Sequence, residues 1–264
     1  MSIIRLDHMC CGYGAHTVLH DITFSIDKPE YVCVVGPNGV GKSTLIRTLN
    51  GLLKPSQGMI ELYGRPLSEY TQKEIAKIVG YVPVLNSDFN IMSVLDTVLI
   101  GRYAHQKWRT TQADLDVAYK ALQAMEIEEL ASCKFNELSA GQKQKVSIAR
   151  GLVQEPSVLM LDEPTANLDI RHQVYVSAFL KELSQRTEIT VFTVSHDLNL
   201  ASKYADKIIL MERPGRIYAI GSPEEIITRE NIRHVYGVDC TIVDDFGTPH
   251  VILQDVEEVS IDRR

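Results

Sequence analysis

The feature that most constrains this chain is a glycine-rich loop that joins a short apolar segment to a helical one. Five residues typical of a buried strand, 31–35, precede the loop, and a helical pattern begins at residue 42. Glycine lets backbone amides approach an anion closely, and a helix N-terminus adds partial positive charge. The loop therefore predicts a phosphate-binding site in which Lys42 reaches the β- and γ-phosphates and Ser43 binds Mg²⁺. Its nine residues are Gly36, Pro37, Asn38, Gly39, Val40, Gly41, Lys42, Ser43 and Thr44.

Apolar segments rich in β-branched residues alternate with helical segments along much of the chain. The predicted strands are residues 31–35, 158–161, 189–194 and 208–211. The predicted helices are residues 42–53, 171–183 and 198–204. This alternation predicts an α/β fold with a mostly parallel sheet that carries helices on both faces.

Three regions depart from that alternation. The first sixty or so residues alternate apolar and polar side chains between glycine turns, which predicts an antiparallel β patch. Residues 93–139 are almost purely helical in pattern, which predicts an inserted helical subdomain. After Gly215 we expect short elements, among them a helix after Ser222 and a hairpin that turns through residues 246–249. The expected organisation is a core with the β patch (1–85), a helical subdomain (86–140), the rest of the core (141–221) and a C-terminal accessory tail (222–264).

The composition is that of an ordinary globular protein, with 45% hydrophobic and 23% charged residues. A formal net charge of −7 argues against nucleic acid as a partner. The longest apolar runs fall far short of the roughly 18 residues that span a bilayer, and the early charges at Arg5 and Asp7 are unlike a secretory signal. Five cysteines without C-x-x-C spacing predict reduced, mostly buried thiols.

A pair of acidic residues, Asp162 and Glu163, directly follows the apolar segment 158–161. Ligands bind at the carboxyl ends of the strands in open α/β sheets, so we expect this pair near the glycine-rich loop. There Asp162 would hold the metal ion with Ser43, and Glu163 would polarise the attacking water. His196 follows the next predicted strand and is the second catalytic candidate. Taken alone, the acidic pair also fits solvated carboxylates at a strand end, and a lone histidine there also fits a structural role.

A second helix N-terminus is predicted at Ser139, within the sequence Leu-Ser-Ala-Gly-Gln at residues 138–142. Serine is among the preferred capping residues, and small residues follow it, so this end could also face an anion. A helix cap without a ligand is the alternative at this position.

Taken in order, these motifs resemble those of the ABC (ATP-binding cassette) ATPases. They are the loop at 36–44, the stretch 138–142, the strand that ends in Asp162 and Glu163, residues 166–169, and residues 195–197. The resemblance runs from about residue 3 to residue 221. It implies a P-loop ATPase core, with ATP and Mg²⁺ as ligand and cofactor.

The resemblance also implies roles for single residues. Tyr13 would stack on adenine, His196 would contact the γ-phosphate, and Asp169 would lie in the loop that joins two cassettes. Three further residues would complete the ATP site of a second copy of the chain, namely Ser139, Gly141 and Gln142. Because the chain contains one cassette, hydrolysis would require a homodimer.

The sequence departs from the family pattern at two positions. Val84 stands where the family usually has a glutamine that meets Mg²⁺ and the attacking water, and valine cannot bind a hard cation. Either Mg²⁺ keeps an extra water, or one of Asn86, Ser87 and Asp88 substitutes, or coupling in this loop is altered. We favour the extra water and expect hydrolysis that is slowed or less tightly coupled. Ala140 replaces the more usual first glycine of the signature.

The subgroup that the chain most resembles serves importers of iron–siderophores, haem and cobalamin. This implies an ATPase at the cytoplasmic face of the membrane, bound to integral-membrane permease subunits and acting indirectly with an extracytoplasmic substrate-binding protein. One alternative is a soluble ABC ATPase without a transport role, for instance in iron–sulfur assembly. A P-loop kinase or GTPase is a weaker alternative, because the guanine signature N-K-x-D is absent and 138–142 would have no purpose.

Overall fold

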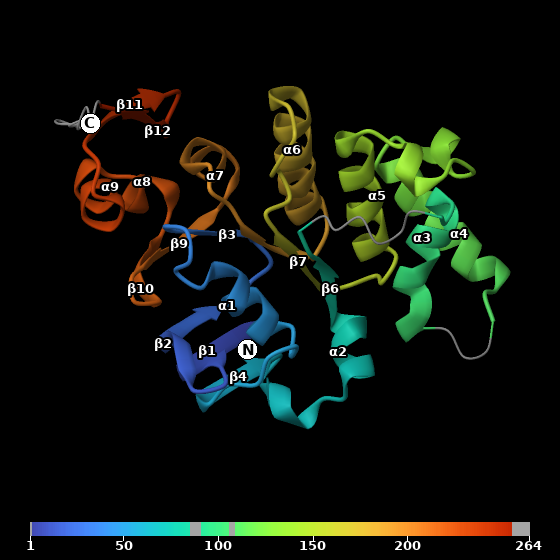
Figure 1. Ribbon diagram of the computed structural model, residues 1–264, viewed down its shortest axis with the longest axis horizontal. Coiled ribbons are helices and arrows are strands. Elements are labelled where there is room, and N and C mark those ends of the chain that lie inside the picture. Colours follow the sequence, from blue (N-terminus) through green and yellow to red (C-terminus); the bar gives the residue numbers. More distant parts are fainter. Residues whose placement is uncertain (1, 85–90, 106–108, 255–264) are drawn as a thin grey trace, which may run out of the picture.

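The computed structural model describes residues 2–84, 91–105 and 109–254, and the strands in these ranges form three sheets (Figure 1). The central sheet has the strand order β10-β9-β3-β8-β7-β6. Its strands are β3 (Tyr31–Val35), β6 (Val79–Val82), β7 (Val158–Asp162), β8 (Thr190–Val194), β9 (Lys207–Glu212) and β10 (Arg216–Gly221). All pairs are parallel except β9 with β10, so the predicted α/β fold with a mostly parallel sheet is confirmed.

A second sheet is antiparallel and comes from the first part of the chain, as predicted. Its strand order is β2-β1-β4-β5, with β1 (Ile4–Tyr13), β2 (His16–Ile26), β4 (Gln57–Leu62) and β5 (Arg65–Pro66). Gly14 (φ +59°) and Gly64 (φ +70°) form two of its turns in the left-handed region that glycine adopts readily. Side chains alternate along β1, where Ile4 and Leu6 are buried and Arg5 is exposed.

The central strands are buried on both faces, which explains their continuous apolar runs. In β3, Val32 and Val34 pack into the core that the antiparallel sheet and α1 (Lys42–Leu49) cover. The alternate residues, Cys33 and Val35, pack into a separate core beneath α7 (Leu198–Tyr204). Figure 1 shows α5, α6 and α7 on one side of the central sheet and α1 on the other.

The helices begin close to the predicted positions, and α7 also ends at the predicted Tyr204, but the predicted ends at residues 53 and 183 differ from the observed ones. Helix α1 stops at Leu49, four residues before the predicted end at residue 53, because Asn50 caps it and Gly51 turns the chain at φ +68°. The remaining helices of the first 186 residues are α2 (Gln72–Ile78), α3 (Val94–Leu99), α4 (Gln112–Ala124), α5 (Ala140–Leu152) and α6 (Ile170–Arg186). Short 3₁₀ turns are η1 (Leu67–Glu69), η2 (Ile100–Ala104), η3 (Glu128–Leu130) and η4 (Phe135–Glu137).

Helices α3, α4 and α5 pack together around one apolar core, as the helical pattern of this region predicts. Val94 and Val98 of α3 are fully buried, and so are Ala118 and Leu122 of α4. Leu115 of α4 is only partly buried. The residue before it, Asp114, is buried instead because it binds Arg102 of η2.

The C-terminal segment contains α8 (Pro223–Ile226), α9 (Arg229–Tyr236) and a hairpin of β11 (Cys240–Asp245) and β12 (Thr248–Leu253). The turn is narrower than predicted, since Thr248 and Pro249 already pair with β11. Asn199 of α7 binds the backbone of Val251 on β12, which holds the hairpin against the core.

One prediction from composition, that of reduced and mostly buried thiols, is confirmed. All five cysteines are free thiols, and Cys11, Cys33 and Cys240 are buried. None of the helices in the described ranges has the length and apolar character needed to cross a bilayer.

Candidate functional site

Three neighbouring strands bring the predicted phosphate and catalytic residues to one edge of the central sheet. Because β3, β8 and β7 are adjacent and parallel, the loop after β3, His196 after β8, and Glu163 after β7 meet there. They enclose a cavity of about 420 Å³. Its lining residues are Val18, Asn38, Gly39, Gly41, Lys42, Ser43, Thr44, Glu163 and His196.

The glycine-rich loop leaves the N-terminus of α1 open. Gly41 is the N-cap at φ +107°, and no side chain caps the helix. A Cβ on Gly41 would lie 2.7 Å from Leu19 Cδ2, so this position has room only for glycine. The first amides of a helix have no acceptor within it, so those of α1 can bind an anion in the cavity.

Lys42 is held at the base of the loop and is only 5% exposed. Its ammonium donates to the carbonyl oxygens of Gly36 at 2.7 Å and Pro37 at 3.1 Å. Burial lowers the pKa of Lys42, while the nearby carboxylates of Glu163 and Asp162 act to raise it. The charge thus sits in a fixed place without a direct carboxylate partner, where a phosphate can pair with it.

Ser43 and Asp162 form an oxygen pair beside the ammonium. The Ser43 hydroxyl donates to Asp162 Oδ1 at 2.9 Å, and Asp162 is only 2% exposed. Burial raises the pKa of Asp162, the Ser43 hydrogen bond lowers it, and the charge of Glu163 adds to the rise. Buried negative oxygen is a good ligand for a hard cation, and Mg²⁺ takes its other ligands from water and phosphate. The residues present therefore fit Mg²⁺ bound together with a nucleotide.

Glu163 and His196 contact each other across the mouth of the cavity. Glu163 adopts a left-handed conformation, φ +52°, so the chain turns sharply after β7. His196 Nε2 lies 2.5 Å from Glu163 Oε1, and His196 Nδ1 lies 3.5 Å from the Lys42 ammonium. A neutral imidazole with its proton on Nε2 satisfies both contacts, donating to Glu163 and accepting from Lys42. The structure thus joins three separate motifs in one hydrogen-bonded chain.

Tyr13 lies at the end of β1 with its side chain 45% exposed. Arg47 of α1 donates to its hydroxyl from Nη1 at 3.4 Å. Sequence reasoning did not find Arg47. The signal was its spacing, because it stands four residues after Ser43 and so shares a face of α1 with it.

The signature residues lie elsewhere in the chain's own fold. Ser139 caps α5, as the sequence predicts, and its Oγ accepts from the Gln142 backbone amide at 3.3 Å. Gln142 Oε1 accepts in return from the Ser139 amide at 2.9 Å. Across the ranges described, no hydrogen bond or ion pair joins residues 139–142 to the loop at 36–44. Asp169 is also separate and caps α6.

Val84 follows β6 at the same edge of the sheet and is exposed. The three residues weighed as substitutes for the family's glutamine, Asn86, Ser87 and Asp88, lie outside the described residues. Val84 therefore occupies the expected place after the strand without a polar side chain.

A groove opens between the core and the helical region, next to β6. Its volume is about 740 Å³. Two of its lining residues, Tyr103 and Ile100 of η2, are exposed apolar side chains, and Tyr103 is 79% exposed. The other lining residues are Gln72, Lys73, Ala76, Tyr81, Pro83, Gly101, Ala104, Arg150 and Gln154.

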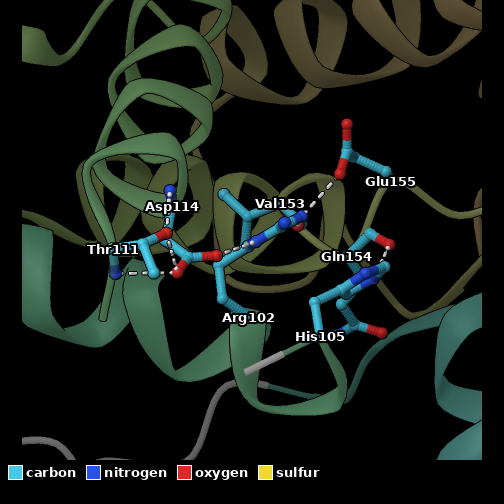
Figure 2. Close-up of polar contacts among 7 residues, drawn as sticks. All are labelled: Arg102, His105, Thr111, Asp114, Val153, Gln154 and Glu155. Atoms are coloured by element: carbon cyan, nitrogen blue, oxygen red, sulfur yellow. Dashed lines mark hydrogen bonds and ion pairs between the residues drawn. The ribbon is translucent and has the colours of Figure 1, made fainter. Parts of the chain in front are cut away.

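Behind this groove, Arg102 of η2 ties the C-terminal end of α5 to α4 (Figure 2). Its guanidinium donates to Asp114 Oδ1 at 3.0 Å, to the Val153 carbonyl at 2.8 Å and to Glu155 Oε2 at 2.6 Å. His105 Nε2 lies 2.9 Å from the Gln154 carbonyl oxygen. Figure 2 shows both side chains reaching the end of α5, Arg102 from η2 and His105 from the position directly after it. Because this end carries the partial negative charge of the helix, a buried cation there stabilises the attachment.

Comparison with known proteins identifies relatives over nearly the full chain. A family profile described as ABC transporter matches residues 19–166. The ferric enterobactin transport ATP-binding protein FepC of Escherichia coli is 40% identical over 259 residues, which cover 95% of this chain and 94% of that protein.

Two solved structures show the same fold. An ABC transporter of the metal-chelate type, in an inward-facing conformation, matches with a TM-score of 0.83 and 30% identity over 96% of this chain and 98% of the other. A bacterial ABC transporter cassette solved as a dimer matches with a TM-score of 0.72 and 27% identity over 83% of this chain and 98% of the other. The likeness therefore extends over the whole described fold.

Proposed function

Because the chain belongs to the ABC transporter family, whose ATP-binding domains hydrolyse ATP to drive transport, we propose that it is the ATPase subunit of an importer for iron–siderophores, haem or cobalamin. The observation that carries the proposal is the chain of contacts from Lys42 through His196 to Glu163, at the mouth of a cavity lined by the glycine-rich loop. These contacts connect the Lys42 ammonium, which can bind phosphate, to the Glu163 carboxylate, which can accept a proton.

In the proposed mechanism the backbone amides of the loop and the Lys42 ammonium bind the β- and γ-phosphates. Ser43 and Asp162 would hold Mg²⁺, which would neutralise phosphate charge. Glu163 accepts a proton from the attacking water, while the His196 hydrogen bond fixes its orientation. Once Glu163 has taken up the proton, the Nε2–H of His196 can turn from Glu163 to the terminal phosphate and stabilise its charge. Tyr13, supported by Arg47, provides the surface on which adenine stacks.

Ser139, Gly141 and Gln142 serve the ATP site of a second copy. The Ser139 oxygen already accepts one hydrogen bond within its own helix, but its hydroxyl proton is free to donate to a phosphate. Ile170, next to Asp169, is 79% exposed, which supports burial of this loop between two copies. A dimer that closes around two ATP molecules satisfies both features.

The groove beside η2 is the proposed docking site for the permease, which places this chain at the cytoplasmic face of the membrane. The exposed side chains of Tyr103 and Ile100 suit an apolar protein surface. Through Arg102, the groove is tied to α5, whose far end carries Ser139. A movement of the dimer can thus reach the permease through one rigid helix. An extracytoplasmic binding protein delivers cargo to the permease, so the cargo does not touch this chain.

The cargo class is supported by the ferric enterobactin relative and by the metal-chelate type transporter. Among the residues described, no cluster of three or more His, Cys, Asp or Glu side chains is placed to hold a metal. A permease gene beside the gene for this chain would support the importer. Neighbouring iron–sulfur assembly genes without a permease would favour the alternative of an ATPase without a transport role.

The direct test is Glu163→Gln, because glutamine keeps the shape of glutamate but cannot accept the proton. We expect ATP turnover to fall by roughly 10²–10⁴-fold while ATP binding persists. Sedimentation with ATP and Mg²⁺ should show a stable dimer, since hydrolysis no longer releases it. Glu128→Gln is the matched control, because Glu128 is exposed on η3, away from the cavity. Near-normal turnover together with a monomeric Glu163→Gln variant would refute the proposal.

A further inference from the structure

One histidine outside all the predicted motifs lies between two of the regions that the dimer would use. His172 is in the first turn of α6, whose N-cap is Asp169. Asp169 Oδ1 accepts from the His172 backbone amide at 2.9 Å, and His172 Nδ1 lies 2.9 Å from both carboxylate oxygens. The same carboxylate therefore caps the helix and holds the imidazole ring in one orientation.

The other edge of that ring faces Gly141 in the first turn of α5. A Cβ built on Gly141 would lie 2.5 Å from His172 Cδ2 and 2.7 Å from Nε2, closer than atoms can approach. The ring cannot easily move away, because Asp169 holds its Nδ1. A side chain at Gly141 would therefore collide with His172 of the same protomer. Ala140 is exposed, which explains why a methyl group is accepted at that position.

A second contact between the same helices lies about one turn further along. The Lys145 ammonium sits 4.1 Å from the centre of the Tyr175 ring. Lys145 is four residues after Gly141, and Tyr175 is three residues after His172, so the two contacts repeat along α5 and α6. Since the Lys145 contact does not involve His172, the helices should remain packed when the imidazole is removed.

We propose that His172 is a positioning residue that fixes the spacing between the Asp169 loop and the Ser139 turn. The inference rests on the proposed dimer, in which both segments of one copy approach the nucleotide held by the other. The carboxylate of Asp169 orients the ring, and the ring sets the distance to Gly141, so the two segments reach the second copy as one unit. The role is conformational, because His172 touches neither the cavity nor the glycine-rich loop.

The first experiment compares Glu163→Gln with the double variant Glu163→Gln/His172→Ala. We expect the second change to weaken ATP-driven dimerisation by about tenfold, as measured by sedimentation, because the two segments lose their common support. The affinity of the monomer for fluorescent ATP and the thermal midpoint should stay unchanged. In the otherwise unmodified protein, His172→Ala should lower kcat with little change in KM for ATP, which a loss of general stability would not produce.

His234→Ala is the matched control. His234 also pairs with a carboxylate, Glu212 at 2.9 Å, but lies on α9 outside the predicted site. Its loss should leave dimerisation and kcat unaltered. If Glu163→Gln alone fails to dimerise, the proposed function fails; if it dimerises and His172→Ala changes neither dimerisation nor kcat, only the role of His172 is refuted.

A second experiment measures the coupling between the ring and the signature turn. Gly141→Ala should impair dimerisation strongly because its methyl group displaces the imidazole. Combined with His172→Ala, the methyl group has space, so the double variant should be no worse than Gly141→Ala alone. Additive losses from the two changes would overturn the proposal, because they would mean that the two residues act independently.

Discussion

The starts of helices α1 and α5 are built in opposite ways, although both are predicted to face the same kind of ligand. Helix α1 begins at Gly41 without any side-chain cap, and side chains from three strands converge on its open end. Helix α5 begins at Ser139, where a capping box already engages two backbone amides, those of Ser139 and Gln142. The open end can bind phosphate through its backbone amides, whereas the closed end offers the Ser139 hydroxyl proton and the two amides that the box does not use, those of Ala140 and Gly141. In the dimer proposed above, the chain would hold one half of its ATP site complete and lend the other half to a second copy.

The largest effect is expected when one copy of the chain carries a damaged glycine-rich loop and the other copy a damaged Ser139 turn. Lys42→Ala removes the cation of the open end, and Ser139→Phe blocks the closed end, so each variant alone should lose roughly 10²-fold or more of its ATPase rate. Mixed in equal amounts, they should regain about a quarter of the original rate, because half of the dimers would contain one intact site of two. The measurement is ATPase activity against mixing ratio. No recovery on mixing would show that Ser139 serves its own chain.

The second prediction concerns the C-terminal end of α5, opposite Ser139, where Arg102 ties the helix to α4. Asp114→Ala removes the buried partner of Arg102 and the capping box of α4, and should lower the free energy of unfolding at pH 7 by about 2–4 kcal/mol. Chemical denaturation measures this. Asp116→Ala is the control, because Asp116 is exposed on the same helix and, within the part of the chain that the structure describes, accepts only from Gln112.

The stability lost in Asp114→Ala should also depend on pH. Hydrogen bonds from Thr111 and then from Arg102 lower the pKa of Asp114 from 3.8 to about 2. A carboxylate with a lowered folded-state pKa stabilises the fold above its ordinary pKa and loses that contribution as pH falls toward 2. The difference in stability between Asp114→Ala and the unmodified protein should therefore shrink between pH 4 and pH 2. A constant difference would assign the stabilisation to packing alone.

The third prediction concerns Val84, which stands in place of the family's glutamine. If Mg²⁺ keeps an extra water because valine cannot bind it, Val84→Gln should supply the missing oxygen and raise the ATPase rate by about 3–10-fold. The Mg²⁺ concentration for half-maximal activity should fall as well. Val84→Leu changes size without adding an oxygen and should leave both quantities unaltered. Equal rates and equal Mg²⁺ dependence in the glutamine variant would refute the idea.

The smallest effect is expected at Ala140. Its side chain is exposed at the first position of α5, so Ala140→Gly should change the ATPase rate by less than about twofold. A large loss would mean that the methyl group makes a contact in the dimer. This outcome would place Ala140 in the interface together with Gly141.

The residues of the glycine-rich cavity could be predicted from the sequence more fully than the contacts between helices that hold the Ser139 end in place. Glu163 directly follows β7, His196 lies two residues after β8, and Lys42 ends the loop that follows β3. The rule that parallel strands present their carboxyl ends together was enough to group them. The contacts of Arg102 with Val153 and of His172 with Gly141 join segments that are 51 and 31 residues apart. No local periodicity marks such pairs, because they depend on how helices pack. The early end of α1 was missed because Gly51 interrupts a pattern that is otherwise apolar.

The position of β3 in the central sheet has a consequence for biosynthesis. Its hydrogen-bonded neighbours on the two sides are β8 and β9, which lie more than 150 residues later in the chain. Contacts of such sequence separation form slowly, and domains emerge from the ribosome N-terminal end first. The strand that precedes the glycine-rich loop therefore lacks hydrogen-bonded neighbours on both sides until translation has passed residue 212. Truncated nascent chains that stop before β9 should bind nucleotide poorly, even though they carry the entire glycine-rich loop.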